Sequence, residues 1–218
     1  MSSTSVVKIC DVRSSDALQI CKDCNADFIG MHLIDPPIRP ELVEKYKEIV
    51  ENSGLLKTVL LFKSIPTDDL VSILKLIPFD YIQIHRPCSI EEVISLKDRV
   101  LNETGKKVGI IPVFEAHNCD YSFVIEISQY VDFILFDSHY RGGTGLRIAA
   151  DDLEAIAKNC SGINYFIAGG INPDNVKNVL ELAHPYGVDV QTGVESARHV
   201  KDYDKVKELV EIVRSFEK

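Results

Sequence analysis

The stretch that decides the fold is residues 165–175, YFIAGGINPDN. It begins with a short apolar run rich in aromatic and β-branched residues, which is typical of a buried β-strand. The run leads directly into Gly169-Gly170. Asn172 and Pro173 follow, and these residues are favoured at the N-cap and at the first position of an α-helix. The stretch therefore predicts a strand that ends in a tight glycine turn and passes straight into a helix.

The same unit recurs on both sides of this stretch. The expected strands are Val6–Cys10, Phe28–Leu33, Thr58–Phe62, Tyr81–His85, Val108–Phe114, Phe133–Asp137, Tyr165–Ala168 and Val188–Gln191. The expected helices cover residues 14–24, 40–51, 67–75, 89–104, 121–129, 150–159, a segment from 172, and 202–216. Strands that alternate with helices predict right-handed crossovers and a parallel sheet. Eight such units favour one closed (β/α)8 barrel over residues 1–218, because an open doubly wound sheet more often has five or six strands.

The composition excludes several classes of protein. The net charge is −9, and Lys and Arg are scattered among more numerous acids, whereas a nucleic-acid surface needs clustered cations. No apolar stretch reaches the ~18 residues of a membrane span, and the N-terminus lacks an apolar signal core. We therefore expect a cytoplasmic protein without nucleic-acid or membrane partners.

The six cysteines do not indicate a disulfide framework or a metal site. Disulfides are rare in a chain of this kind that stays in a reducing compartment. Cys21 and Cys24 form a lone C-x-x-C, and no second Cys or His pair lies nearby to complete tetrahedral zinc. We interpret them as small buried residues and expect no metal and no cofactor.

Glycines at the ends of the last strands indicate a phosphate site. Gly169 and Gly170 follow the seventh expected strand, and Thr192-Gly193 follows the eighth. Glycine lets backbone N–H groups approach an anion closely, and helix N-termini add positive partial charge. The loops after strands seven and eight are the usual phosphate site of such barrels. Gly143, in the glycine-rich segment after strand six, is a further candidate. The alternative is that these glycines only form tight turns.

Two strand ends carry groups that suit proton transfer. Cys10 ends the first expected strand and Asp137 ends the sixth. A thiolate is a competent general base and a carboxylic acid a competent general acid. Lys8 shares the face of Cys10 and would favour the thiolate. The alternatives are a small buried cysteine and a capping aspartate.

Further polar residues occupy other strand ends. His85 ends the fourth expected strand and shares its face with Gln83. A lone histidine is more often structural than catalytic. Lys63 and Arg86 offer positive charge for a second anionic group, or are solvated surface charges. His32 and His139 carry weaker signals.

At these residues the chain resembles the phosphoribosylanthranilate isomerase family. The resemblance extends from the first expected strand to about Asp202, with the matching blocks in the family's order. It rests on Lys8-Ile9-Cys10, Asp27-Phe28-Ile29-Gly30, Ile82-Gln83-Ile84-His85, Phe136-Asp137, Gly142-Gly143-Thr144-Gly145, residues 168–176 (AGGINPDNV) and residues 188–195 (VDVQTGVE).

This resemblance implies a (β/α)8 barrel that carries out an Amadori rearrangement in tryptophan biosynthesis without a metal or cofactor. The family's base is a cysteine in the position of Cys10, and its acid is an aspartate in the position of Asp137. The partner is a phosphorylated sugar, and we expect a monomer or homodimer. The resemblance implies that backbone groups hold the phosphate at Gly169, Gly170, Thr192 and Gly193. We predict further substrate contacts from Lys8, Arg39, His85, Arg86, Gly143 and Asp189.

Departures from the family pattern cluster where the aromatic half of the substrate would bind. Asp11 and Arg86 each replace a glycine. The loop after the second strand, residues 34–39, is short, with Arg39 as the candidate partner of the substrate carboxylate. A Pro-Gly pair is absent at residues 196–199. We therefore predict a divergent member. The alternatives are an isomerase of another aminosugar phosphate, a barrel lyase or epimerase that uses Lys8 for a Schiff base, and a non-catalytic phosphate-ligand-binding relative.

Overall fold

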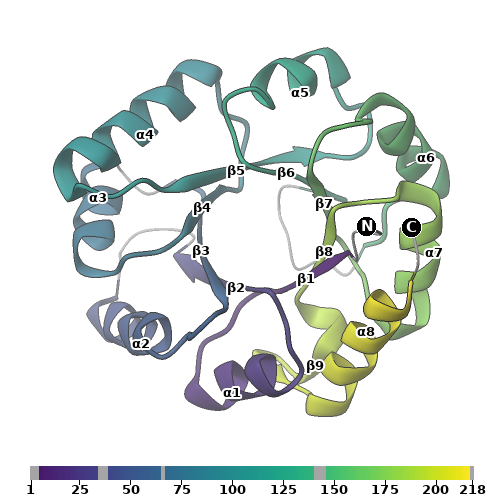
Figure 1. The fold of residues 1–218 in the computed structure, drawn as a ribbon, viewed down its shortest axis with the longest axis horizontal. Helices are drawn as coiled ribbons and strands as arrows, with labels where there is room; N and C mark the ends of the chain where they lie inside the picture. The colour runs from purple at the N-terminus through teal and green to yellow at the C-terminus, as the bar shows by residue number, and fades with distance from the viewer. Residues whose placement is uncertain (1–4, 34–38, 65–66, 140–145, 217–218) are drawn as a thin grey trace.

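Eight parallel strands close into a barrel in the order β1-β2-β3-β4-β5-β6-β7-β8, and helices surround it (Figure 1). The structure is a computed structural model that describes residues 5–33, 39–64, 67–139 and 146–216. Neighbouring strands pair in parallel all the way round, and β1 closes the ring by pairing with β8. The predicted (β/α)8 barrel is therefore confirmed.

The elements agree with the expected ones, and their ends shift by at most about two residues, as is usual for helix and strand ends. The strands are β1 (Val6–Ile9), β2 (Phe28–Leu33), β3 (Lys57–Phe62), β4 (Tyr81–Ile84), β5 (Gly109–Glu115), β6 (Ile134–Asp137), β7 (Tyr165–Ile167) and β8 (Gly187–Val190). The helices are α1 (Ser15–Asp23), α2 (Pro40–Glu51), α3 (Thr67–Leu76), α4 (Ile90–Thr104), α5 (Tyr121–Ile127), α6 (Ala150–Asn159), α7 (Pro173–Ala183) and α8 (Tyr203–Ser215).

Side-chain caps fix where several helices begin. Ser14 and Ser89 accept hydrogen bonds from backbone N–H groups in the first turns of α1 and α4. Asn172 and Asn175 form a reciprocal capping box at the start of α7, and Pro173 occupies a position where its missing N–H costs nothing. These caps hold the start of each helix close to the strand end that precedes it.

The barrel interior has an apolar floor. Phe28, Phe133 and Phe166 contact one another edge to face, with ring centroids 5.4–5.8 Å apart. Tyr81 and Tyr186 pack against the same group. Side chains alternate along a strand, so the inward residues nearer the carboxyl ends of β1, β2, β4, β6 and β8 lie above this floor. Most of them are polar, so the carboxyl end of the barrel is the place to look for a functional site.

Three short elements that the sequence analysis did not predict follow β8. They are the 3₁₀ turn η1 (Thr192–Val194) and the antiparallel strands β9 (Glu195–Ala197) and β10 (Val200–Lys201). Lys201 is buried, and its Nζ lies 2.8 Å from Oε1 of Glu195. This ion pair joins the two strands, and a hydrogen bond of 3.3 Å from Lys201 Nζ to the carbonyl of Gln191 ties the hairpin to the residue after β8.

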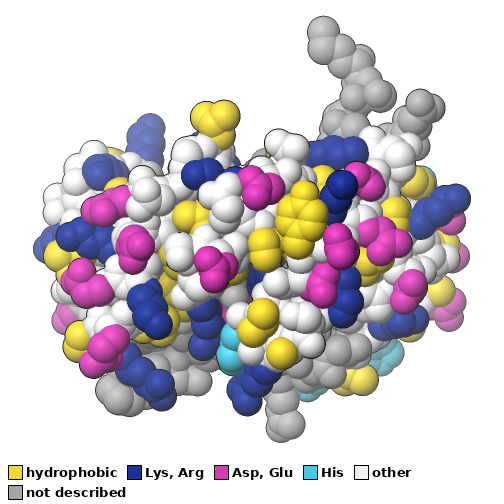
Figure 2. All heavy atoms as spheres, turned by 90° about the horizontal axis from the view of Figure 1, so that it is seen from below, with side chains coloured by type: hydrophobic (Ala, Val, Ile, Leu, Met, Phe, Trp, Pro, Cys, Tyr) yellow, Lys and Arg dark blue, Asp and Glu magenta, His cyan; other side chains and the backbone are white. Residues whose placement is uncertain are grey.

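Acidic and basic side chains are interspersed on the face shown in Figure 2, and no separate basic patch is seen there. Among the residues that the structure describes, no helix combines the length and the hydropathy that crossing a bilayer requires.

Candidate active site

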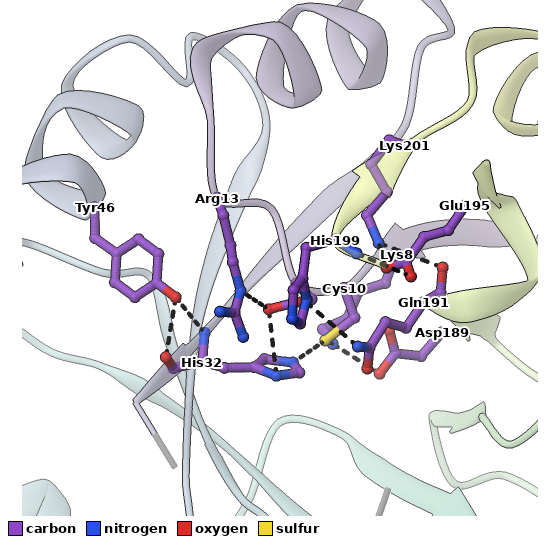
Figure 3. A network of polar contacts seen from close by, with 11 residues as sticks. Lys8, Cys10, Arg13, His32, Tyr46, Asp189, Gln191, Glu195, His199 and Lys201 are labelled. Atoms are coloured by element: carbon purple, nitrogen blue, oxygen red, sulfur yellow. Dashed lines mark hydrogen bonds and ion pairs between the residues drawn. The ribbon is translucent and has the colours of Figure 1, made fainter. Parts of the chain in front are cut away.

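Lys8, Cys10 and Asp189 form a buried polar group inside the barrel (Figure 3). The strand register places Lys8 beside Asp189, because β1 pairs with β8 at these two residues. Lys8 Nζ donates to Asp189 Oδ2 over 2.7 Å and to Cys10 Sγ over 3.3 Å. The Lys8 side chain is fully buried, so the ammonium is committed to these two partners. The predicted shared face of Lys8 and Cys10 is confirmed.

The surroundings of Cys10 favour the neutral thiol over the thiolate. Burial raises the pKa of Cys10 to about 12, and the nearby Asp189 carboxylate raises it further, while Lys8 lowers it. Lys8 thus acts on Cys10 in the expected direction, because it favours the thiolate. Burial and Asp189 outweigh it, however, because both penalise a negative charge on sulfur.

Asp137 ends β6 and is 7% exposed. Burial raises the pKa of Asp137, and Asp189 raises it further, whereas hydrogen bonds from the backbone of His139 and Ser138 lower it. A raised pKa keeps the carboxyl group protonated to higher pH than usual, which suits a general acid. The Asp189 carboxylate therefore raises the pKa values of both Cys10 and Asp137.

His85 and Gln83 contribute to the same polar layer from β4. Gln83 Nε2 lies 3.3 Å from His85 Nδ1, and His85 Nε2 lies 4.0 Å from Asp137 Oδ2. Both side chains are buried. The structure therefore brings the predicted residues His85 and Asp137 together at neighbouring positions of the barrel mouth.

His32 contacts Cys10, which its weak sequence signal did not predict. Its Nε2 lies 3.0 Å from Cys10 Sγ (Figure 3). Its Nδ1 lies 3.5 Å from Asp11 Oδ1. Tyr46 from α2 fixes the histidine backbone, because its hydroxyl bonds both the N–H and the carbonyl of His32. The available signal was Gly30, which shares the inward face of β2 with His32. A Cβ at Gly30 would lie 2.7 Å from Cys10 Sγ.

Asp11 and His199 are paired residues in left-handed backbone conformation. Their φ values are 62° and 65°, where residues other than glycine are uncommon. His199 Nδ1 lies 2.5 Å from Asp11 Oδ2, and Arg13 Nε donates to Asp11 Oδ1. Burial alone would raise the pKa of Asp11, but His32, Arg13 and His199 together hold it below its ordinary value. The hairpin after β8 thus covers a carboxylate that remains charged beside Cys10.

The two glycine turns predicted to bind phosphate pack directly against each other. Gly169 and Gly170 have φ values of 90° and 61°. A Cβ at Gly193 would lie 1.8 Å from the carbonyl oxygen of Ile171, so the turn after β8 touches the turn after β7. Thr192 opens η1 beside them. This arrangement places the backbone of both turns at one corner of the barrel mouth.

Gly193→Ala should lower the free energy of unfolding by about 1–3 kcal/mol and raise KM, because the added Cβ must displace one turn from the other. Gly193 does not have positive φ, so steric overlap rather than backbone strain is the cause. Urea denaturation and steady-state kinetics measure the two effects. Gly162→Ala is the control, since Gly162 has φ 85° with nothing within 4 Å of its added Cβ. It should lose stability at unchanged KM. An unchanged KM in Gly193→Ala would contradict the prediction that the two glycine turns bind the phosphate.

The last three residues predicted to contact substrate are Arg86, Arg39 and Gly143, and their surroundings differ. Arg86 Nε donates to the carbonyl of Lys63, and its guanidinium pairs with Glu92 at the start of α4. It is therefore engaged by the protein itself. Arg39 is exposed and precedes the first turn of α2. Gly143 lies outside the described residues.

The matching family model and the relatives named below belong to one family. Residues 7–212 match the family model described as N-(5'-phosphoribosyl)anthranilate (PRA) isomerase. A curated N-(5'-phosphoribosyl)anthranilate isomerase from Aquifex aeolicus is 31% identical, over 96% of this chain and 98% of the relative. The solved isomerase from Pyrococcus furiosus is 26% identical with a TM-score of 0.75, over 97% of this chain and 100% of that chain.

A further similar structure was solved with a bound ligand. It is a phosphoribosyl anthranilate isomerase in complex with reduced 1-(o-carboxyphenylamino)-1-deoxyribulose 5-phosphate. It has a TM-score of 0.75 and 20% identity, over 97% of this chain and 100% of that chain. At this identity the likeness shows the shared fold alone.

Proposed function

Because the chain belongs to the N-(5'-phosphoribosyl)anthranilate isomerase family, we propose that it converts N-(5'-phosphoribosyl)anthranilate to the corresponding 1-amino-1-deoxyketose phosphate in tryptophan biosynthesis. The observation that carries this proposal is the shared location of three features. A buried thiol at the end of β1, a carboxyl group of raised pKa at the end of β6 and the paired glycine turns after β7 and β8 all lie at the carboxyl end of one barrel.

The proposed chemistry is an Amadori rearrangement by general acid and base. Asp137 protonates the ring oxygen of the aminoribose, and the bond between this oxygen and C1 breaks to leave an iminium group. Cys10, as the thiolate, takes the proton from C2. The electrons of the C–H bond form a C1=C2 double bond, and the iminium nitrogen becomes neutral. The resulting enol then becomes the ketone by moving a proton to C1. A raised pKa at Asp137 supports its role as the acid.

The phosphate is proposed to bind at the corner formed by Gly169, Gly170, Thr192 and Gly193. Backbone N–H groups at closely packed turns bind phosphate without a side-chain cation. Such a site is compatible with a net charge of −9, because it needs no cluster of Lys or Arg.

Acceptor atoms inside the barrel suit the hydroxyl groups of the sugar. Gln83 Oε1 and Asp189 Oδ1 are buried and accept no hydrogen bond from the described residues. A buried acceptor requires a donor, and sugar hydroxyls supply donors. For the anthranilate carboxylate we propose Arg39, because Arg86 already pairs with Glu92.

The alternative chemistry, in which Lys8 forms a Schiff base, requires Lys8 to be a neutral amine. Burial favours the neutral amine, but Asp189 and Cys10 together raise the pKa of Lys8. An ammonium paired with a carboxylate is not a nucleophile. The geometry therefore supports the Amadori reaction better than a Schiff-base mechanism.

The test is turnover of phosphoribosylanthranilate, generated in situ and followed by the loss of its fluorescence. We expect turnover, and we expect calorimetry to detect binding of the reduced deoxyribulose 5-phosphate compound but only weak binding of its dephosphorylated form. A second aminoribose 5-phosphate that lacks the carboxylate is the comparison substrate. Turnover of this compound without turnover of phosphoribosylanthranilate would overturn the substrate assignment. Absence of both turnover and binding would overturn the proposal.

A further inference from the structure

The thiol of Cys10 faces a histidine at hydrogen-bonding distance, and that histidine faces a buried carboxylate. His32 Nε2 lies 3.0 Å from Cys10 Sγ, and His32 Nδ1 lies 3.5 Å from Asp11 Oδ1. All three side chains are buried, with Asp11 fully so and His32 8% exposed. The two ring nitrogens of His32 therefore have different partners, a proton donor on one side and an anion on the other.

We propose that His32 accepts the proton of the Cys10 thiol, with Asp11 orienting the imidazole, so that Cys10, His32 and Asp11 form a proton relay that produces the catalytic thiolate. The catalytic part of this inference rests on the proposed function, whereas activation of the thiol is independent of any substrate. His32 and Asp11 act through Cys10 and are positioning residues.

The chemical need for such a relay follows from the state of the thiol. Burial raises the pKa of Cys10 to about 12, so near neutral pH the sulfur must give its proton to a neighbouring acceptor before it can act as a base. Burial lowers the pKa of His32 to about 3, which keeps the ring neutral at rest. The transfer is therefore uphill, and the imidazolium forms only as a short-lived ion pair with the thiolate across the 3.0 Å between Nε2 and Sγ. Asp11 carries the negative charge that stabilises the imidazolium formed by this transfer.

The charges around His32 act in both directions. From β1 and its following loop, Lys8 and Arg13 disfavour a charged ring, and Asp11 favours it. From β4, His85 disfavours it. The Lys8 ammonium, 3.3 Å from Sγ, favours the thiolate that the transfer leaves behind. The ion pair of thiolate and imidazolium is thus held between an ammonium on the sulfur side and a carboxylate on the ring side.

The relay is balanced over one turnover. The thiol proton moves to Nε2 and leaves its electron pair on sulfur. The thiolate takes the C2 proton of the iminium and becomes a thiol again. The imidazolium gives its proton to water, and the carboxylate left on Asp137 after ring opening takes a proton from water. No oxidant, reductant or metal takes part.

The structure also holds the relay in place. Tyr46 bonds the backbone N–H and carbonyl of His32 at 3.2 and 2.9 Å. On the other side of Asp11, its Oδ2 lies 2.5 Å from His199 Nδ1 and 3.4 Å from Gln191 Nε2. The hairpin after β8 therefore fixes the carboxylate from above, while Tyr46 fixes the end of β2.

The first arm of the test measures pH profiles of kcat/KM for wild type, His32→Gln and Asp11→Asn. Glutamine keeps polar atoms but does not titrate, and asparagine tolerates the left-handed backbone of position 11. In His32→Gln we expect kcat to fall by about 10²–10⁴-fold at neutral pH, with a small change in KM. The loss should shrink as the pH rises, because hydroxide then ionises the thiol directly. Asp11→Asn should show a smaller loss of the same form.

The matched control is His184→Asn, at the C-cap of α7 on the opposite end of the barrel. Its φ is 43°, which asparagine also tolerates. It should leave the pH profile unchanged. Circular dichroism and thermal melting confirm that each variant is folded. If the kcat/KM of His32→Gln is lower than that of wild type by the same factor at every pH, the effect is structural and the relay is overturned.

The second arm uses no substrate. The rate at which methyl methanethiosulfonate modifies Cys10 is followed by peptide mass spectrometry, which separates Cys10 from the other five cysteines. We expect at least a tenfold slower reaction in His32→Gln at pH 7 and nearly equal rates at pH 10. Equal rates at pH 7 would overturn the relay even if the isomerase is active. If the Cys10 thiol of wild type reacts faster at pH 7 than that of His32→Gln, but wild type does not turn over phosphoribosylanthranilate, the proposed function is overturned and the relay is supported.

Discussion

Cys10→Ala should lower turnover of phosphoribosylanthranilate by about 10²–10⁴-fold, and Asp137→Asn should cause a loss of similar size. Alanine removes the base that takes the C2 proton, and an amide has no acidic proton for the ring oxygen. Both variants should still bind the reduced deoxyribulose phosphate compound, because the glycine turns after β7 and β8 are untouched. Steady-state kinetics and calorimetry measure the two effects. The signature is a fall in kcat without loss of binding.

Cys21→Ala is the control for the cysteine variant. Cys21 is a buried thiol whose pKa burial also raises to about 12, but it lies in α1 outside the barrel. Its replacement should cost some stability and leave kcat near the wild-type value. A Cys10→Ala protein with wild-type turnover would remove Cys10 from the mechanism and return it to the interpretation of a small buried residue.

Asp137 also predicts a pH dependence. The pKa of Asp137 is raised, mainly by burial, so the protonated form that acts as the acid persists to higher pH than for an ordinary aspartate. Activity that depends on this form is complete at low pH and falls as the pH rises through the raised pKa. For the base, the raised pKa of Cys10 makes the thiolate scarce at low pH. The two groups thus have opposite pH dependences. In the proposed relay, His32 takes the thiol proton locally, so the thiolate does not have to form by losing a proton to bulk water.

The fold followed from local sequence patterns. Each strand is a short apolar run, and several helices begin at a side chain that can cap them, such as Ser14, Ser89 and Asn172. These signals involve neighbours in the sequence, so the element order could be predicted without knowing any long-range contact. The positions of Cys10 and Asp137 followed in turn, because parallel strands in a barrel end at the same face.

Contacts between distant segments could not be predicted in this way. His32 and Cys10 are 22 residues apart, and nothing in either strand alone indicates that Sγ and Nε2 meet. The pairing of Asp11 with His199 depends on a hairpin that the sequence pattern did not reveal. Even a near neighbour was missed in one case: Arg86 has the residue type of an anion ligand, but it pairs with Glu92, six residues on at the start of α4. Local patterns therefore predicted which strand ends form the candidate site, whereas the partners of each group required the structure.

Lys8→Met should lower the free energy of unfolding by about 3–5 kcal/mol, because it leaves the Asp189 carboxylate buried without its ammonium. Asp189 is 7% exposed, and the Lys8 Nζ at 2.7 Å is its ion-pair partner. Urea denaturation measures the loss. The matched variant is Lys8→Met with Asp189→Leu, which removes both charges and should recover most of the stability. A double variant no more stable than Lys8→Met would show that packing, and not an unpaired charge, causes the loss.

The double variant should nevertheless be a poor enzyme, which explains why a buried ion pair of small net stability is present at all. Lys8 is the cation 3.3 Å from Cys10 Sγ and opposes the effect of burial on that thiol. Asp189 raises the pKa of Asp137 and so helps to keep the acid protonated. Removing the pair takes away the ammonium beside the thiolate and lowers the pKa of Asp137. The activity that remains should therefore begin to fall at a lower pH than in wild type. Stability recovered without activity would show that Lys8 and Asp189 serve the chemistry of the site more than the fold.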